Sequence, residues 1–123
     1  MPTYQPPLRD MQFVMNEVLD VPSTLRQLPA HAEIDSDTIQ SVLEEGGKFA
    51  AEVLLPLNRI GDTQGCKLDP STHAVTTPDG FKQAYDQYVA GGWPALSGDP
   101  TYGGQGLPIV VNQCFYEMLN SAN

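Results

Sequence analysis

Basic residues are scarce in this chain. Six lysines and arginines stand against 15 acidic residues among 123, which gives a net charge of −9. Nucleic acids and anionic membrane surfaces are bound through lysine and arginine, so this composition disfavours both as partners. We expect an acidic, solvated exterior.

Cysteine is also rare, with only Cys66 and Cys114 in the sequence. Two cysteines cannot form a disulfide framework, and their spacing fits no zinc site. Cys114 falls on an apolar helical face and is interpreted as a small core residue, whereas Cys66 lies in a polar loop and is interpreted as a free thiol.

Long apolar runs are missing. No stretch approaches the roughly 18 apolar residues that read as a membrane-spanning helix, so we expect no membrane span. The N-terminal region has Arg9 and Asp10 early and lacks the apolar segment of a signal peptide. These features predict a cytoplasmic protein.

No segment shows the sustained alternation of apolar and polar residues that is typical of a strand. Hydrophobic residues make up 41% of the chain, enough for one core. They recur at helical spacing, so the predicted fold is all-α, a small bundle of four main helices. The helices are expected over residues 8–19, 37–57 and 78–90, and from 107 or 108 to the end. Residues 61–77 are polar and turn-rich, and should form a loop with at most a short strand pair.

Capping residues and prolines suggest where these helices begin and end. Asp37, with Gln40 three residues later, predicts the N-cap of the second helix. Pro56 is expected to kink or end that helix, because proline lacks an N–H. Thr77 followed by Pro78 predicts the start of the third.

Two further segments have a specific prediction. Residues 22–29, between two prolines, are expected to be a connector. Gly46 and Gly47 lie inside the second helix, where each glycine costs about 1 kcal/mol relative to alanine. This cost indicates either the close approach of another helix or a tolerated defect.

A glycine- and proline-rich stretch precedes the last helix. Residues 91–108 hold six of the 11 glycines, three of the 11 prolines and the single tryptophan. Glycine and proline each restrict the chain to particular turns. We therefore expect a shaped loop, with its apolar residues, Trp93 and Tyr102 among them, pinned against the helices on either side.

This loop carries a resemblance to a known family. Gly91-Gly92-Trp93-Pro94-Ala95-Leu96-Ser97-Gly98-Asp99-Pro100, then Tyr102-Gly103-Gly104-Gln105-Gly106-Leu107-Pro108, then a helix, resembles the N-terminal helical domain of acyl-CoA dehydrogenases. Residues 1–19 resemble the N-terminal extension of the larger subfamily that includes the 3-methylmercaptopropionyl-CoA dehydrogenases. The resemblance implies two units. Residues 1–34 would be the extension with one helix, and residues 35–123 the N-terminal helical domain, incomplete at its C-terminal end.

The resemblance also implies an activity. Acyl-CoA dehydrogenases remove hydrogens from the α and β carbons of an acyl-CoA, with a glutamate as base and FAD as hydride acceptor. In that family the flavin contacts and the catalytic glutamate lie in later domains. The implied partners of the full-length enzyme are acyl-CoA, an electron acceptor and further copies of itself in a homo-oligomer. We therefore expect no catalytic, cofactor-binding or metal residue in these 123 residues, and no activity from them alone.

Several residues invite a chemical role that their context does not favour. The turn at 103–106 has neither the preceding strand nor the spacing of a phosphate loop. Asp35-Ser36-Asp37 resembles the start of a calcium loop, but Ile39 would occupy a ligand position, so helix capping is favoured. His31 and His73 lie in polar surroundings with no motif beside them and are interpreted as surface residues.

A pair of glutamates and a set of aromatic residues also have structural interpretations. Glu44 and Glu45 are adjacent, so their side chains should diverge on a helix and cannot act as a pair. The aromatic residues of the third helix and the loop could line a ligand groove, but core packing is favoured. They are Tyr85, Tyr88, Trp93 and Tyr102.

Two alternatives to the dehydrogenase interpretation remain. A stand-alone acidic helical module could bind a partner through the last helix, which carries seven apolar positions. A small acyl-CoA-binding module is weaker, because the basic residues available for the phosphates are scattered. They are Arg9, Arg26, Lys48, Arg59, Lys67 and Lys82.

Overall fold

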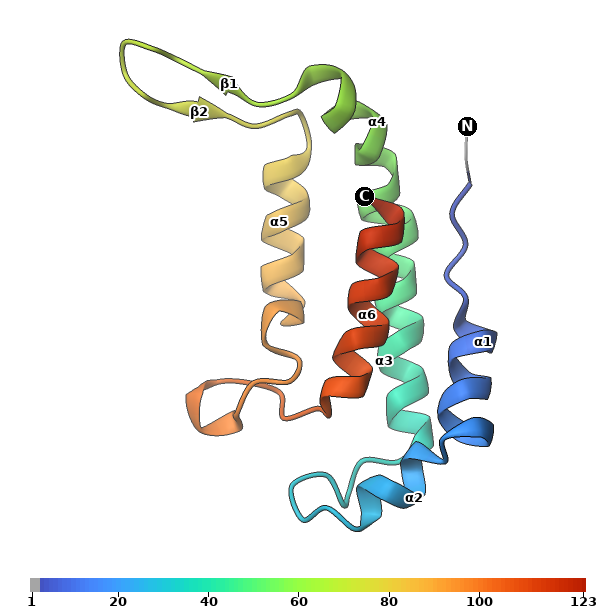
Figure 1. The fold of residues 1–123 in the computed structure, drawn as a ribbon. Helices are drawn as coiled ribbons and strands as arrows, with labels where there is room; N and C mark the ends of the chain where they lie inside the picture. Colours follow the sequence, from blue (N-terminus) through green and yellow to red (C-terminus); the bar gives the residue numbers. More distant parts are fainter. Residues whose placement is uncertain (1–2) are drawn as a thin grey trace.

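The computed structural model describes residues 3–123 and is mostly α-helical, which confirms the predicted class (Figure 1). Met1 and Pro2, part of the predicted N-terminal extension, lie outside the described residues. The helices are α1 (Leu8–Phe13), α2 (Val21–Arg26), α3 (Ser36–Lys48), α4 (Leu55–Gln64), α5 (Phe81–Ala90) and α6 (Ile109–Ala122). π-Helical turns occupy Val14–Val18 and Phe49–Leu54, and 3₁₀ turns occupy Trp93–Ala95 and Pro100–Tyr102. Strands β1 (Lys67–Leu68) and β2 (Val75–Thr76) pair antiparallel.

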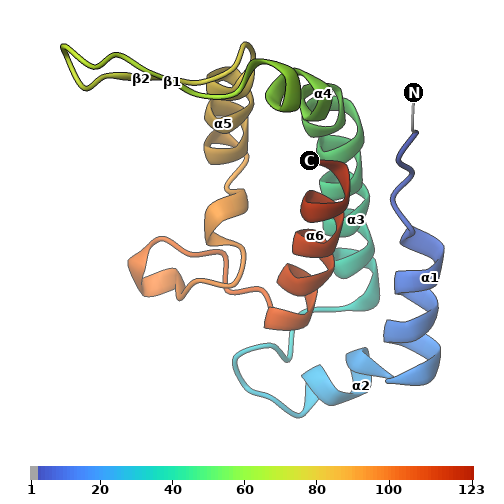
Figure 2. The ribbon, with the colours of Figure 1, turned by 45° about the horizontal axis from the view of Figure 1, so that its top comes forward.

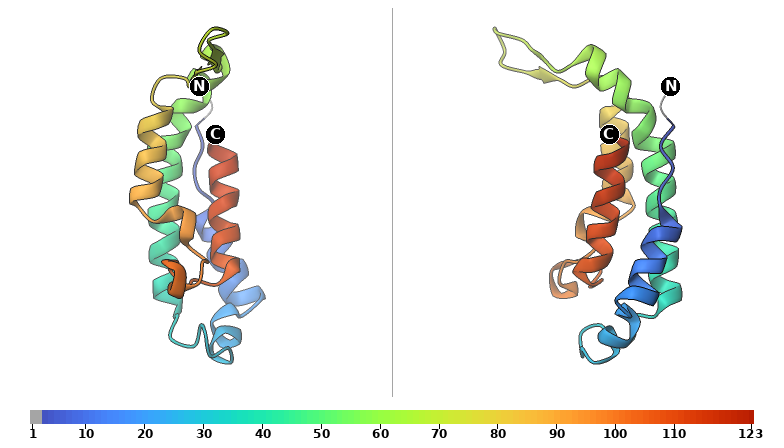
Figure 3. Two further views of the ribbon diagram at one scale, coloured as in Figure 1. Left: turned by 90° about the vertical axis from the view of Figure 1, so that its left-hand side faces the viewer. Right: turned by 45° about the vertical axis from the view of Figure 1, so that its right-hand side comes forward.

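A long helix, formed by α3, the π-helical turn 49–54 and α4, is the central element of the bundle. The helix α6 packs along it, α1 lies on its other side, and α5 stands beside α6 (Figures 1 and 2). The β1–β2 hairpin projects away from the helices, as the turned views show (Figure 3). Within residues 3–123, no helix has both the length and the apolar character that crossing a bilayer requires.

The N-terminal extension holds two short helices where the sequence predicted one. Residues 22–29 were expected to be a connector, but Val21–Arg26 form α2. Pro22 lies in the first turn of this helix, where a missing N–H costs nothing. Val21 and Leu25 are buried and anchor α2 on the bundle. The helix predicted over 8–19 is present as α1 and the π-helical turn that follows it.

The long helix begins and ends at other residues than predicted. Asp35, rather than Asp37, is the N-cap, because its carboxylate accepts a hydrogen bond from the Thr38 N–H at 2.8 Å. This bond lowers the pKa of Asp35. The helix also continues past 57 to Gln64, because Pro56 lies in the first turn of α4, directly after the π-helical turn, and does not end it.

Gly46 marks a close approach of another helix, as one of the two interpretations held, whereas Gly47 faces the extended segment before α1. A Cβ atom on Gly46 would lie 2.7 Å from Cδ2 of Phe115 in α6, and one on Gly47 would lie 3.1 Å from Pro6. Phe115 is 1% exposed. The largest fully buried side chains are Phe115, Leu43, Met118 and Val111. The core therefore sits where α3 and α6 meet.

The third predicted helix starts later than Thr77 and Pro78 suggested. Helix α5 begins at Phe81, after Gly80 with a φ of 85°. Asp79 instead ties the turn to the end of α4: its N–H donates to Gln64 Oε1 at 2.9 Å, and its carboxylate accepts from Gln64 Nε2 at 3.0 Å. The predicted loop with a short strand pair is present as the hairpin, although it begins at Gly65 instead of 61.

The loop 91–108 is ordered, as predicted. Trp93 stacks on Phe115 with ring centroids 4.4 Å apart, and Leu96 is 3% exposed. Backbone bonds close the loop, including Gln105 N–H to the Ala95 carbonyl and Leu107 N–H to the Leu96 carbonyl, both at 2.9 Å. Tyr102 is the exception: its side chain is 89% exposed and packs against nothing.

Alanine at Gly46 tests the close approach of α3 and α6. Overpacking a buried site costs about 1–3 kcal/mol, and alanine returns about 1 kcal/mol of helix propensity. Because Phe115 is fully buried and cannot yield cheaply, we expect Gly46→Ala to lower the free energy of unfolding by about 1–2 kcal/mol in urea titrations. In a Phe115→Leu background the same change should be neutral or stabilising, and a loss of equal size there would contradict the proposed contact.

Alanine at two adjacent glycines tests the loop. A Cβ on Gly104 would overlap the Gly98 carbonyl, whereas a Cβ on Gly103 would meet nothing within 4 Å. Gly103 has a φ of 87°, so Gly103→Ala should cost only backbone strain of about 1–2 kcal/mol. Gly104→Ala should cost more than about 3 kcal/mol, because backbone meets backbone. Equal losses of stability in thermal unfolding would show that the backbones at Gly98 and Gly104 do not touch.

Candidate functional site

An apolar groove of about 340 Å³ lies between α5 and α6. Leu54 and Leu57 of the long helix, Phe81 and Ala84 of α5, and Leu119 of α6 line it. The geometry follows from the neighbouring turn: Phe81 lies against Gly61, where a Cβ would stand 2.7 Å from its ring. This contact holds the start of α5 against α4.

Aromatic side chains form the wall of the groove on the α5 side. Tyr88 lies 6.1 Å from Phe49 and 6.4 Å from Phe115, measured between ring centroids. Burial raises the pKa of the Tyr88 hydroxyl, and the nearby Tyr116 adds to this shift. Tyr85, which also lines the groove, is 64% exposed. Core packing was favoured for the aromatic residues, and it is wrong for Tyr85.

Amide side chains lie at the rim, where α6 ends. Asn123 Nδ2 donates to the Leu54 carbonyl at 3.0 Å, and Asn120 Nδ2 donates to the Tyr116 carbonyl at 2.8 Å. Among residues 3–123, no charged side chain lines the groove. It can therefore accommodate apolar groups. The Asn123–Leu54 contact has no signature in the sequence, because it joins residues 69 positions apart.

The glycine-rich turn at 103–106 and the acidic segment at 35–37 have structural roles. Gln105 Nε2 donates to the Gly92 carbonyl at 2.9 Å and closes the turn. Asp35 caps α3, as the capping interpretation favoured. No group of three or more potential metal-ligating side chains occurs within the described part of the chain.

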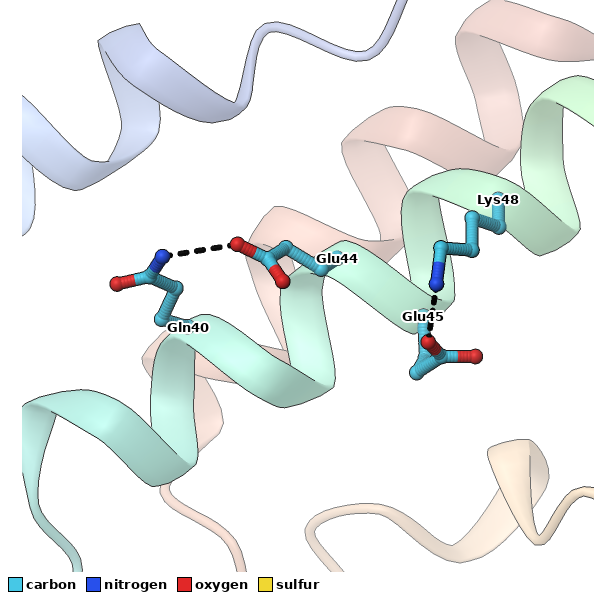
Figure 4. Close-up of polar contacts among 4 residues, drawn as sticks. All are labelled: Gln40, Glu44, Glu45 and Lys48. Carbon is cyan, nitrogen blue, oxygen red and sulfur yellow. Dashed lines mark hydrogen bonds and ion pairs between the residues drawn. The ribbon is translucent and has the colours of Figure 1, made fainter.

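Glu44 and Glu45 do not act together. Glu44 accepts a hydrogen bond from Gln40 Nε2 at 2.8 Å, while Glu45 pairs with Lys48 at 2.6 Å (Figure 4). The two carboxylates point to different sides of α3 in this view. The predicted divergence of this pair is confirmed.

The histidines and cysteines form no disulfide and no metal-ligating group of three or more among residues 3–123. His73 is exposed, in a left-handed turn with a φ of 58°. His31 is half-buried, so it is less exposed than the surface interpretation predicted. Cys66 is exposed and unpaired, and Cys114 is half-buried with its Sγ 3.7 Å from the sulfur of Met15. Burial, and then the Glu117 carboxylate, raises the pKa of the Cys114 thiol.

No family model matches the chain. It is nevertheless 41% identical over 121 residues to 3-methylmercaptopropionyl-CoA dehydrogenase from Ruegeria pomeroyi, across 98% of this chain and 20% of that protein. It is 29% identical to the broad-specificity linear acyl-CoA dehydrogenase FadE5 of Mycobacterium tuberculosis, with the same coverage. A butyryl-CoA dehydrogenase of Syntrophomonas wolfei is 31% identical over 94% of the chain and 19% of its own length.

The chain thus spans about one fifth of the length of the curated relatives that it matches. Each of these alignments covers 94% or more of the chain. The chain belongs, as an N-terminal domain, to the acyl-CoA dehydrogenase family.

Proposed function

We propose that this chain is the N-terminal helical part of an FAD-dependent acyl-CoA dehydrogenase that catalyses α,β-dehydrogenation of an acyl-CoA. The observation that carries the proposal is the 41% identity to a dehydrogenase over 98% of the chain. The role of this part would be structural. It would close one side of the cleft that holds the flavin and the acyl group, and it would support the loop after α5.

The residues described here do not fit a flavin dinucleotide by themselves. The pyrophosphate would need positive side chains or free backbone N–H groups, and the groove has no charged lining. The glycine-rich turn is closed by the side chain of Gln105. We therefore assign the binding of FAD, and the acid–base chemistry, to other parts of the enzyme.

The remaining features of the enzyme are part of the same proposal. Acyl-CoA would be the substrate, and a separate electron acceptor would reoxidise the flavin. We propose a homo-oligomer in the cytoplasm, supported by the family and by the acidic composition, which disfavours a membrane surface. The relatives named above offer no support for a stand-alone interaction module.

The proposal predicts that the chain and the longer protein differ in flavin content and in activity. The protein encoded by the complete open reading frame should purify with bound flavin, and acyl-CoA should bleach the flavin absorption band. The 123-residue chain, produced in the same host, should carry no flavin and should not reduce an artificial acceptor.

Absorption spectra and a dye-reduction assay on both proteins measure these outcomes. Stoichiometric flavin on the short chain would contradict the assignment of FAD to other parts of the enzyme. A longer protein without flavin would contradict the dehydrogenase proposal itself.

A further inference from the structure

The groove between α5 and α6 is an apolar surface left uncovered within residues 3–123. Tyr85 is 64% exposed and Tyr116 is 41% exposed, and both line it. Exposed apolar surface of this kind marks a place where another molecule or another segment packs. The aromatic rings on one wall and the leucines on the other suit apolar side chains.

The groove ends where the chain leaves α6. Three residues of α6, Tyr116, Leu119 and Asn120, contribute to its lining, and so does Asn123 directly after the helix. Asn123 is tied to the Leu54 carbonyl at 3.0 Å, and Leu54 lines the groove too. Any residue joined to Asn123 therefore starts at the rim of the groove.

We infer that in the full-length enzyme this groove is covered by the polypeptide that follows Asn123, through apolar side chains packed between α5 and α6. This inference rests on the proposed function, since the matched relatives have about four fifths of their length outside the matched part. A segment tethered at the rim has an effective concentration near the groove in the millimolar range. It outcompetes a separate protein present at lower concentration.

Two other occupants fit the surface less well. A second copy would have to reach the groove from solution, at a lower effective concentration than a tethered segment. A CoA group would need cations for its phosphates, and no lysine or arginine lines the groove. Both remain as outcomes of the experiment below.

The test compares two variants of the full-length enzyme that each gain one cysteine, Tyr85→Cys and Val75→Cys. Tyr85 in the groove and Val75 in the projecting hairpin are 64% and 62% exposed, so they are matched in accessibility within this domain. Alkylation by iodoacetamide is followed for each peptide by mass spectrometry and is normalised to the rate in urea. We expect Tyr85→Cys to react at least tenfold more slowly than Val75→Cys without added acyl-CoA.

A photo-crosslinking residue at Tyr85 identifies the occupant. We expect crosslinks within one chain, to a peptide C-terminal to Asn123. Equal alkylation rates, protection that appears only with acyl-CoA, or a crosslinked dimer would each overturn the inference. Flavin content and dye reduction are measured on the same samples. An active flavoenzyme in which Tyr85→Cys is alkylated as fast as Val75→Cys would contradict this inference alone. The absence of both flavin and activity would contradict the proposed function.

Discussion

The Phe115 ring is the contact on which the other packing depends. It fills the space that Gly46 leaves on the long helix, and it stacks on Trp93 at a centroid distance of 4.4 Å. It also lies against Tyr88 of α5 at 6.4 Å. One buried side chain therefore joins the long helix, α5, α6 and the loop between them. Burying an aromatic residue of this size contributes on the order of 1.5–3 kcal/mol, before the cost of misfitting neighbours is added.

This arrangement holds the helices and the loop of the domain together. Its polar groups act locally: Asp35 caps a helix, Asp79 joins two helix ends, and Gln105 closes a turn. Two of the exposed aromatic residues, Tyr85 and Tyr116, line the groove beside α6. A domain built in this way can supply a rigid wall and a docking surface.

Much of the fold could be predicted from the sequence, because helical periodicity and the low helix propensity of glycine are local signals. The mid-helix glycines indicated a close helix contact, and Gly91 with Gly92 ends α5 as predicted. Helix ends were placed less well. Several residues near each end could serve as a cap, and the choice depends on partners distant in sequence, such as Gln64 for Asp79. A groove lined by Tyr85 and Tyr88 was one interpretation of the sequence, although core packing was favoured. Its walls come from three helices whose spacing no local pattern encodes.

Residues that carried the family resemblance pack against neighbouring residues in the structure. Gly104 has no side chain because the Gly98 backbone occupies that space, and Trp93 lies flat on Phe115. The loop from Gly91 to Pro108 thus resembles its family because it must turn tightly and bury one large ring. A signature of this kind reports the architecture of a domain with more certainty than its reaction, since any substrate compatible with the same wall would keep it.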